Sequence, residues 1–373
     1  MTEVERITEL NEIRFPKLGW TFNIDPTAFK IGNVEIQWYG IIITLGLLLA
    51  LIYCFPKMKR FGLDADRTID AVIGGVIGGI IGARVYYVIF NWDEYKGNFK
   101  EMLNTRNGGL AIYGGIIGAV LVGLLICKLR KIKILPMLDI TVLGFLIGQG
   151  VGRWGNFINQ EAFGTNTDSF FGMTGGRIQQ TIINQTQIGG EMYSNGNVTM
   201  LWENPVHPCF LYESLWCLLG FVLLSTWSKR RKYDGQIFLM YLAWYGLERF
   251  VVEGMRTDSL MFGELRVSQV LSAVIFIASV IIQIVMFSKI RREPESYVLY
   301  ANTRESRLLL EESRRRRMGV PIEDSRTELD SFIEDDADDD FDIDEDDDYD
   351  EVSEAVSAED AEEKTVQNDK END

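Results

Sequence analysis

The sequence predicts an all-α integral membrane protein with seven transmembrane helices, and three observations support this fold class. The chain holds seven apolar segments near the roughly 20 residues that a helix needs to cross a bilayer. Lys and Arg gather in alternate connections between these segments, as in multi-pass membrane proteins. A strongly acidic stretch closes the chain and differs in composition from everything before it. The seven segments are Ile36–Phe55, Ala71–Phe90, Gly108–Cys127, Ile134–Val151, Pro208–Trp227, Ile237–Val252 and Val267–Phe287.

Two features distinguish individual segments. The second and third carry glycines three and four residues apart, which allow helix backbones to approach closely, although a subset could instead leave room for lipid acyl chains. The sixth segment is the shortest and contains Glu248 and Arg249. The glycines concerned are Gly74, Gly75, Gly78, Gly79 and Gly82 in the second segment and Gly108, Gly109, Gly114, Gly115 and Gly118 in the third.

Basic residues predict the orientation of the helices. Four clusters fall on one side of the membrane if the N-terminus is external and the C-terminus cytoplasmic, which is the arrangement that positive charge favours. The opposite connections carry fewer basic residues. The clusters are Lys57, Lys59, Arg60 and Arg67; Lys128, Arg130, Lys131 and Lys133; Lys229, Arg230, Arg231 and Lys232; and Lys289, Arg291 and Arg292.

The composition predicts four parts. Residues 1–35 are charged and lack an apolar core, so we expect an external segment without a cleavable signal peptide. Residues 36–290 form the membrane domain, with residues 152–206 as an external loop, and residues 291–322 are a basic juxtamembrane segment. Residues 323–373 hold 26 acidic and 3 basic residues, which predicts a disordered cytoplasmic tail. Removing this tail from the totals of 54 acidic and 37 basic residues leaves 28 and 34.

Metal and disulfide chemistry are not expected. The four cysteines lie in or beside apolar segments without paired spacing, and buried free cysteine behaves as a small hydrophobe. His207 is the only histidine, which argues against a histidine-ligated metal centre. We therefore expect no metal, no other cofactor and no nucleic-acid partner.

Polar residues gather in the half of the segments that the predicted topology places outside. Ionisable groups at membrane depth are costly and by default mark a functional site, although an isolated arginine at a helix end can simply reach toward water. A one-sided gathering predicts a site open to the outer leaflet. Its members are Tyr39, Arg84, Tyr87, Tyr113, Arg153, Asn156, His207, Arg249 and Glu253.

Five motifs together resemble the signatures of the prolipoprotein diacylglyceryl transferase family. They extend over about residues 36 to 275, nearly the whole membrane domain, and the combination is far more specific than any single motif. The motifs are the block Gly152–Gly164, Trp38-Tyr39-Gly40, Gly82-Ala83-Arg84 with Tyr87, His207-Pro208 with Leu211-Tyr212-Glu213, and the run Tyr245–Arg256.

The resemblance implies a reaction, its partners and a location. Enzymes of this family take the diacylglyceryl group from phosphatidylglycerol and join it to the lipobox cysteine thiol in the signal peptide of a prolipoprotein. The products are a thioether and glycerol 1-phosphate, in the first step of bacterial lipoprotein maturation. The resemblance therefore predicts a multi-pass enzyme of the bacterial cell membrane, embedded among membrane lipids, with its active site facing the outer leaflet.

The resemblance also suggests roles for residues. We expect Arg153 to bind the phosphatidylglycerol head group and Arg249 to bind the phosphate and leaving group, because a guanidinium grips phosphate oxygens in pairs. Tyr113 is a third catalytic candidate, as base or hydrogen-bond donor, where many members have histidine. Glu161 and Glu253 either orient the arginines or serve structure alone. The further predicted substrate-binding residues are Tyr39, Arg84, Asn156, Asn159, Glu161, Gly164, Tyr245, Glu253 and Arg256.

Two other functions fit part of the pattern. A seven-helix transporter or receptor for an anionic ligand would explain the helix count and the buried charges, but not the five motifs. An enzyme that transfers the phosphoglycerol head group would use the same lipid and would release diacylglycerol instead of glycerol phosphate.

Overall fold

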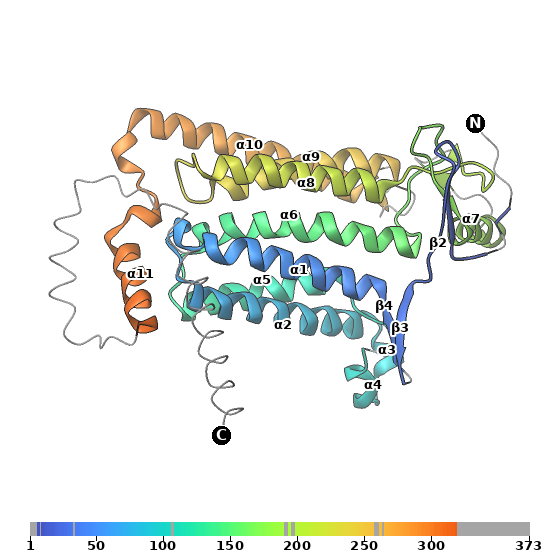
Figure 1. The fold of residues 1–373 in the computed structure, drawn as a ribbon, viewed down its shortest axis with the longest axis horizontal. Coiled ribbons are helices and arrows are strands. Elements are labelled where there is room, and N and C mark those ends of the chain that lie inside the picture. The colour runs from blue at the N-terminus through green and yellow to red at the C-terminus, as the bar shows by residue number, and fades with distance from the viewer. Residues whose placement is uncertain are drawn as a thin grey trace, which may run out of the picture. The chain divides into compact units, whose positions relative to one another are not determined.

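The computed structural model is a bundle of long helices with a small group of strands at one end (Figure 1). The chain divides into two units, residues 1–314 and 315–373, and all elements except the last residues of the final helix belong to the first. The structure describes residues 6–7, 9–32, 34–105, 108–189, 193–194, 198–256, 261–262 and 265–318. The predicted disordered tail lies outside these residues.

Seven long helices form the bundle, and each corresponds to one predicted apolar segment. Helices α2 and α5 pack together, as do α1 and α6, α6 and α8, and α9 and α10. Among the described residues, six of the seven are long and apolar enough to cross a membrane; α9 is of similar length, but Glu248, Arg249 and Glu253 interrupt its apolar stretch. Their bounds are α1 Trp38–Lys57, α2 Ala65–Phe90, α5 Ile112–Leu129, α6 Ile134–Asn159, α8 Cys209–Ser228, α9 Gln236–Met255 and α10 Val267–Arg292.

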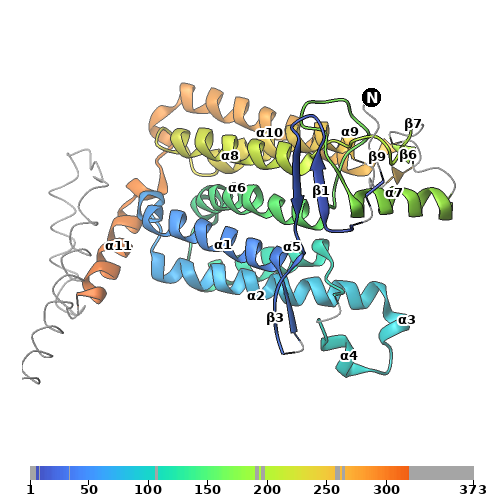
Figure 2. The ribbon, with the colours of Figure 1, turned by 45° about the vertical axis from the view of Figure 1, so that its right-hand side comes forward.

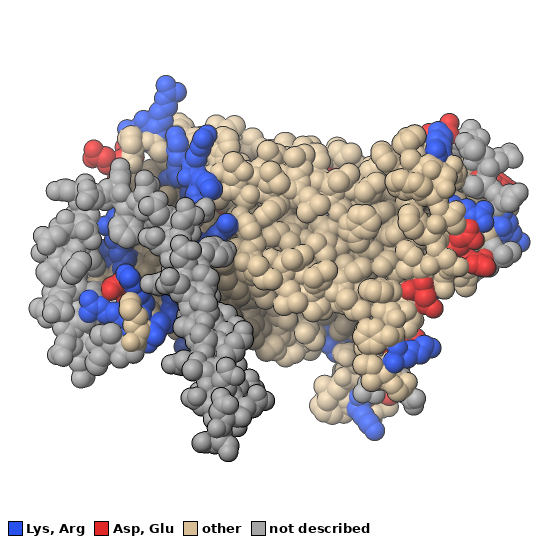
Figure 3. All heavy atoms as spheres, in the orientation of Figure 1, with Lys and Arg blue, Asp and Glu red and all other residues tan. Residues whose placement is uncertain are grey.

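The middle of the bundle presents almost no charged side chains on the face shown in Figure 3, whereas Lys, Arg, Asp and Glu gather at its two ends. Many outward-facing positions are large and apolar, including Ile80 and Ile81 of α2, Leu121 of α5 and Ile284 of α10, which are more than half exposed. An apolar belt between two charged ends is the surface that a bilayer requires. The fold is thus that of an integral membrane protein.

Glycines bring α2 and α5 into close contact, as their spacing predicts. A Cβ atom at Gly118 would lie 2.2 Å from the carbonyl oxygen of Gly78, and one at Gly114 would lie 2.3 Å from that of Gly82. No side chain fits there, so the two backbones lie against each other. Helix packing is therefore the structural use of the glycines within α2 and α5. The prediction is wrong for Gly108 and Gly109, which lie before α5 with positive φ.

Helix α6 extends further than the sequence predicts. The apolar run ends at Val151, but the helix continues for two more turns and ends at Asn159, where Gln160 adopts a left-handed conformation with φ of 55°. Arg153 and Asn156 were expected to follow the helix and instead lie within it. The helical backbone satisfies its own hydrogen bonds, so polar side chains do not end it if they find partners.

Short strands and helices cover the end of the bundle where the N-terminus lies (Figure 2). Strand β1 pairs antiparallel with both β2 and β5, and β3 pairs antiparallel with β4, which leads directly into α1. Side chains of β1 and α7 form a second core with Phe157 and Phe210. The remaining elements are β1 Glu12–Phe15, β2 Trp20–Asn23, β3 Thr27–Ile31, β4 Val34–Gln37, α3 Trp92–Tyr95, α4 Phe99–Leu103, β5 Thr174–Gly175, α7 Gly176–Gly189, β6 Tyr193–Ser194, β7 Val198–Thr199, β8 Met261–Phe262 and β9 Leu265–Arg266.

The opposite end is closed by a C-terminal segment that docks onto the bundle. Ser306 donates a hydrogen bond to the carbonyl of Gly62 (3.1 Å), and Ser313 donates one to Asp64 (2.8 Å). At the same end, Asp139 of α6 is completely buried and accepts hydrogen bonds from the backbone amides of Gly235 and Phe238, which caps α9. The segment consists of η2 Pro294–Ser296, η3 Tyr300–Asn302 and α11 Arg304–Arg317. Its η3 contacts η1, which spans Lys59–Phe61 between α1 and α2.

Candidate active site

The predicted site residues of α1, α6 and α9 lie at the end of the bundle covered by the N-terminal strands. Helices α6 and α9 finish there, while α1 and α8 begin (Figure 1). Residues that are up to 210 positions apart in the sequence, such as Tyr39 and Arg249, therefore occupy the same end. This end lies opposite the one that carries the predicted cytoplasmic basic clusters.

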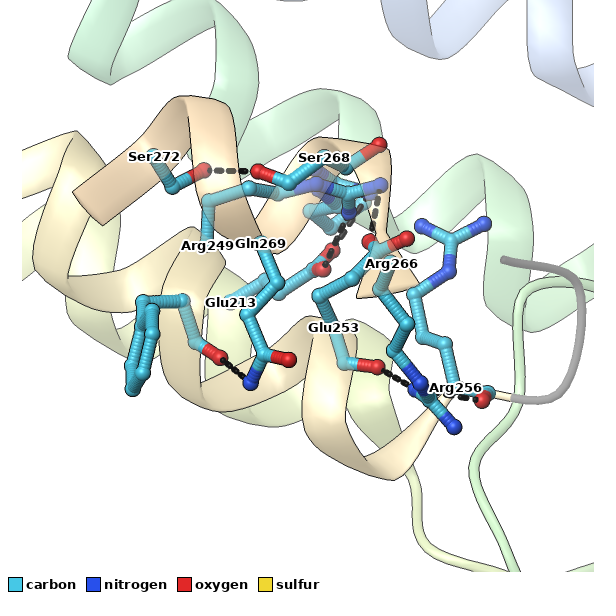
Figure 4. Close-up of polar contacts among 10 residues, drawn as sticks. Glu213, Arg249, Glu253, Arg256, Arg266, Ser268, Gln269 and Ser272 are labelled. Carbon is cyan, nitrogen blue, oxygen red and sulfur yellow. Dashed lines mark hydrogen bonds and ion pairs between the residues drawn. The ribbon is translucent and has the colours of Figure 1, made fainter. Parts of the chain in front are cut away.

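Glu213 of α8 joins the two predicted catalytic arginines. Its Oε2 atom pairs with Nη1 of Arg153 from α6, and its Oε1 atom lies 3.7 Å from Nη1 of Arg249 from α9. Arg249 also pairs with Glu253 one turn along α9, with 2.6 Å between Nη2 and Oε2 (Figure 4). The side chains of both carboxylates are 2% exposed, whereas those of Arg153 and Arg249 are 23% and 21% exposed. Buried carboxylates thus hold arginines that remain partly accessible.

Hydrogen bonds fix α6 against α8 beside this ion network. The indole Nε1 of Trp154 donates to the Ser214 hydroxyl (3.2 Å), and that hydroxyl donates to the carbonyl of Gly150 (2.8 Å). The Trp154 ring also meets Phe210 edge to face, with 5.5 Å between centroids. These contacts set the register in which Arg153 and Glu213 face each other.

Glu161 folds back onto the end of α6. Its Oε1 atom accepts hydrogen bonds from the side-chain amides of Asn156 (2.9 Å) and Asn159 (3.3 Å), and its backbone amide donates to the carbonyl of Asn156. The reversal needs positive φ at Gln160 and at Ala162, both at 55°. The carboxylate therefore orients both asparagine amides.

Tyr39 completes this corner from the first turn of α1. Its ring lies against Gly155, and its hydroxyl interacts electrostatically with Glu161 and Arg153. From α9, Tyr245 interacts electrostatically with Arg249 and Arg153 and stacks on Tyr241, with 5.9 Å between ring centroids. Two of the predicted tyrosines thus lie within the electrostatic range of the arginines.

Gly164 lies where the loop after α6 crosses the ends of two other helices. Its amide donates to the carbonyl of His207 (3.0 Å), and it forms a bridge with Arg256. A Cβ atom at this position would lie 2.8 Å from the Cβ of His207 and 3.2 Å from the carbonyl oxygen of Met255. The absence of a side chain is what allows the loop to pass here.

Arg266, the N-cap residue of α10, and Gln269 in its first turn support the end of α9. Arg266 donates through Nη1 to the carbonyl oxygens of Glu253 and Arg256, the latter at 3.2 Å (Figure 4). Gln269 donates to the carbonyl of Phe250 (3.1 Å). These bonds hold the helix end that carries Arg249 and the predicted substrate-binding residue Arg256.

Comparison with known proteins decides the family. A profile described as prolipoprotein diacylglyceryl transferase matches residues 26–285. The chain belongs to this family. The phosphatidylglycerol–prolipoprotein diacylglyceryl transferase of Listeria innocua is 39% identical over 275 residues, which cover 74% of this chain and 94% of the relative. That of Bacillus mycoides is 43% identical over 268 residues, which cover 72% and 94%.

Family membership confirms the resemblance that the five motifs predict, and the protein is an enzyme of the transferase class. The matched region begins in the β2–β3 connection and ends in α10. It therefore includes every residue of the ion network. The docked segment with α11 lies beyond the matched region.

Arg84, a predicted substrate-binding residue, donates its hydrogen bonds to backbone carbonyl oxygens. It is 7% exposed and donates to Glu101 (2.7 Å), Met102 (2.8 Å), Gly108 (3.3 Å) and Gly109 (2.9 Å). Its guanidinium also lies 5.0 Å from the ring centroid of Tyr95. In this structure Arg84 fastens the connection between α2 and α5, and contact with substrate remains a prediction.

Tyr113 lies apart from the arginines. It is the second residue of α5, which packs on α2, and its side chain is 59% exposed. Among the described residues, no hydrogen bond or ring contact joins it to Arg153 or Arg249. Its catalytic role remains a prediction. Tyr113 could take part only if the bound substrate extends from the arginines toward α5.

Two further residues complete the site's surroundings. Glu213 belongs to one of the five motifs but was not among the predicted site residues, although a carboxylate inside an apolar helix requires a partner. That signal was present, but its partners, Arg153 and Arg249, lie 60 and 36 positions away in the sequence, on other helices.

His207 lies just before α8. Its Nδ1 atom is 3.3 Å from the Tyr212 hydroxyl, and burial lowers the pKa of its imidazole.

The described residues hold no group of three His, Cys, Asp or Glu side chains that could bind a metal ion. The four cysteines are free and buried. The chemistry that these residues offer is that of accessible guanidinium groups, amides and carboxylates. Such an arrangement suits an anionic ligand whose charge grows during a reaction.

Proposed function

We propose that this transferase moves the diacylglyceryl group of phosphatidylglycerol to the lipobox cysteine of prolipoproteins, forming a thioether and releasing glycerol 1-phosphate. The names of the relatives support both substrates. The observation that carries the proposal is the pair of partly exposed arginines that Glu213 holds between α6, α8 and α9.

The reaction needs a cationic site for a phosphate ester that leaves with added negative charge. Preorganised cations in a site shielded from water contribute strongly to stabilising such charge. Arg153 binds the head group of phosphatidylglycerol, and Arg249 binds the phosphate as it becomes the leaving group. Because Glu213 and Glu253 already fix the guanidinium planes, little reorganisation accompanies the reaction.

The other predicted residues position the two substrates. Asn156 and Asn159 offer amide groups to the glycerol or phosphate oxygens, and Glu161 orients them. Tyr113 donates a hydrogen bond to the bound substrate. The remaining contacts proposed for lipid or peptide are Tyr39, Arg84, Gly164, Tyr245, Glu253 and Arg256.

The proposed location is the bacterial cell membrane, with seven spans, an external N-terminus and an active site facing the outer leaflet. The four basic clusters and the proposed site belong to opposite ends of the bundle, which supports this orientation. Single-cysteine variants at Lys96 and Glu293 test it in intact cells, since the native cysteines are buried. An impermeant reagent should label position 96 at once and position 293 only after permeabilisation; the reverse result overturns the orientation.

Product identification tests the reaction. The purified protein is incubated with phosphatidylglycerol vesicles and a lipobox peptide, and both lipid and peptide products are analysed by mass spectrometry. The proposal requires a peptide heavier by one diacylglyceryl group and an equal amount of glycerol phosphate. Diacylglycerol among the products would instead indicate head-group transfer, and unchanged lipid and peptide would indicate a transporter or receptor.

A further inference from the structure

Glu248 is a buried carboxylate beside the ion network, and it forms no salt bridge with any of the described residues. It precedes Arg249 on α9, is 8% exposed, and its Oε1 atom has no hydrogen-bond partner among the described residues. Buried polar groups are nearly always hydrogen-bonded, so an exception calls for an explanation. An ionisable side chain at membrane depth points by default to function.

The charges of the network show that Glu248 is not needed as a counter-ion. Arg153 and Arg249 bring two positive charges, and Glu213 and Glu253 are already paired with them. Glu248 is therefore a third carboxylate beside two arginines. A further acid with only a structural task would raise the cost of burying the cluster.

Glu248 is less deeply enclosed than the two paired carboxylates, but its Oε1 atom is buried, so the thiol must enter between α6, α8 and α9 to meet it. Glu213 and Glu253 retain 2% and 1% exposure, less than the 8% of Glu248. Tyr245, a proposed substrate contact, lies one helical turn earlier on the same face of α9. The titratable groups that interact electrostatically with Glu248 are Arg153 of α6, Glu213 and Cys217 of α8, and Tyr241, Tyr245 and Arg249 of α9.

The transfer needs a group that removes the proton from the attacking thiol, because a free cysteine has a pKa of about 8.5 and only its thiolate is nucleophilic. A base must offer a lone pair that nothing else occupies. The carboxylates of Glu213 and Glu253 are paired with arginines, whereas Oε1 of Glu248 has no hydrogen-bond partner in the part of the chain that the structure describes. Resting on the proposed function, we propose that Glu248 is the general base that takes the proton of the lipobox thiol.

The step balances without any other reactant. The thiol proton passes to Glu248, and the sulfur electron pair forms a bond to the terminal glyceryl carbon of the lipid. The bond between that carbon and the phosphate oxygen breaks, and its electron pair remains on the oxygen facing Arg249. Glu248 then gives its proton to the departing phosphate or to water, which restores the carboxylate for the next cycle.

The test separates proton removal from structure by changing the nucleophile. Glu248→Gln keeps the size and burial of the side chain but removes its basicity. It is assayed beside the wild type and the exposed control Glu94→Gln, in phosphatidylglycerol vesicles, with lipobox peptides that carry either cysteine or the more acidic selenocysteine. With cysteine, Glu248→Gln should be slower by about 100-fold or more at neutral pH, and its rate should climb as rising pH ionises the thiol. With selenocysteine, it should recover to within about tenfold of the wild type.

An equal defect with both peptides at every pH would make Glu248 structural and overturn the proposal, as would a normal rate with cysteine. A wild-type enzyme that transfers lipid to neither peptide would instead contradict the proposed function itself. Glu248→Asp covers the case in which the glutamine variant does not fold. It retains a carboxylate, so it should keep the wild-type pH profile at a reduced rate, and a profile that follows thiol ionisation would overturn the proposal.

Discussion

Gly155 lies directly against the ring of Tyr39. A Cβ atom at position 155 would lie 2.5 Å from Cδ2 of this ring and 3.0 Å from Cε2. The contact joins α1 to the last turns of α6, next to Asn156 and one turn before Asn159, the two asparagines that face Glu161. It therefore fixes where Tyr39 stands relative to the ion network.

Gly155→Ala should consequently displace the Tyr39 ring or separate the two helices. Overpacking of this kind costs about 1–3 kcal/mol of stability, and thermal unfolding in detergent measures the loss. Gly148→Ala is a matched control on the same helix, because a Cβ atom there meets nothing within 4 Å. The control should be neutral or slightly stabilising; equal unfolding temperatures for the two variants would show that the Tyr39 contact is not rigid.

Replacement of Arg153 should abolish most turnover without unfolding the protein. Loss of one preorganised group that stabilises developing charge lowers kcat by about 10²–10³. Arg153→Lys should also fail badly, because an ammonium retains the charge but not the planar grip. Arg249→Ala should behave similarly. Ordinary lipidation by Arg153→Ala, measured with phosphatidylglycerol and a lipobox peptide, would place the active site elsewhere.

Tyr113→Phe distinguishes a hydrogen-bond donor from a base. The phenyl ring keeps the packing and removes only the hydroxyl. One lost hydrogen bond is worth about 0.5–1.5 kcal/mol, so turnover should fall by at most about tenfold. A loss of several orders of magnitude in steady-state kinetics would make the Tyr113 hydroxyl the proton acceptor and would count against Glu248.

Two truncations should have different effects. A chain ending at Arg317 should keep nearly all its activity, because the removed residues are strongly acidic in net charge and lie beyond the family match. A chain ending at Thr303 also loses α11, with the hydrogen bonds of Ser306 to Gly62 and of Ser313 to Asp64, and should unfold at a lower temperature. The double substitution of both serines by alanine in the full chain should reproduce part of that loss. Activity assays and thermal unfolding on equally inserted samples measure both effects.

His207 should make stability sensitive to mild acid. Burial lowers its pKa below the ordinary value of 6.5. As pH falls through 6.5 the unfolded chain binds a proton that the folded protein does not, so the free energy of unfolding decreases. The stability contributed by keeping His207 neutral is thus present above pH 6.5 and declines below it. His207→Gln should flatten this decline in unfolding measurements between pH 5 and 7.5, and parallel curves for the two proteins would refute the assignment.

The sequence predicts the helices well because their signal is local. Each apolar segment corresponds to a helix of the bundle, and the glycine spacing predicts the close contact of α2 and α5. The end of α6 was placed too early because composition changes at Val151, while the backbone continues to satisfy its own hydrogen bonds to Asn159.

The site is only partly predictable for a different reason. Polarity at membrane depth identifies Arg153 and Arg249, but the partner of each is set by how the helices pack. Glu213 is paired with both arginines, whereas Oε1 of Glu248 has no hydrogen-bond partner among the described residues, although both are glutamates within apolar helices. Likewise, the occupation of Arg84 by carbonyls depends on the course of a loop that no periodicity describes.

All the hydrogen bonds that Arg84 donates to its loop go to main-chain oxygens. Every amino acid carries the same carbonyl, so the side chains of Glu101, Met102 and their neighbours can be exchanged without loosening the clamp. Gly109 and Tyr95 are exceptions: a Cβ atom at position 109 would lie 2.3 Å from Nη1 of Arg84, and the centroid of the Tyr95 ring lies 5.0 Å from the guanidinium. Sequence drift at the other positions of this loop is therefore compatible with the clamp. A designer who wished to graft a foreign epitope or affinity label onto this end of the enzyme would keep positions 84, 95 and 109 and rewrite the rest.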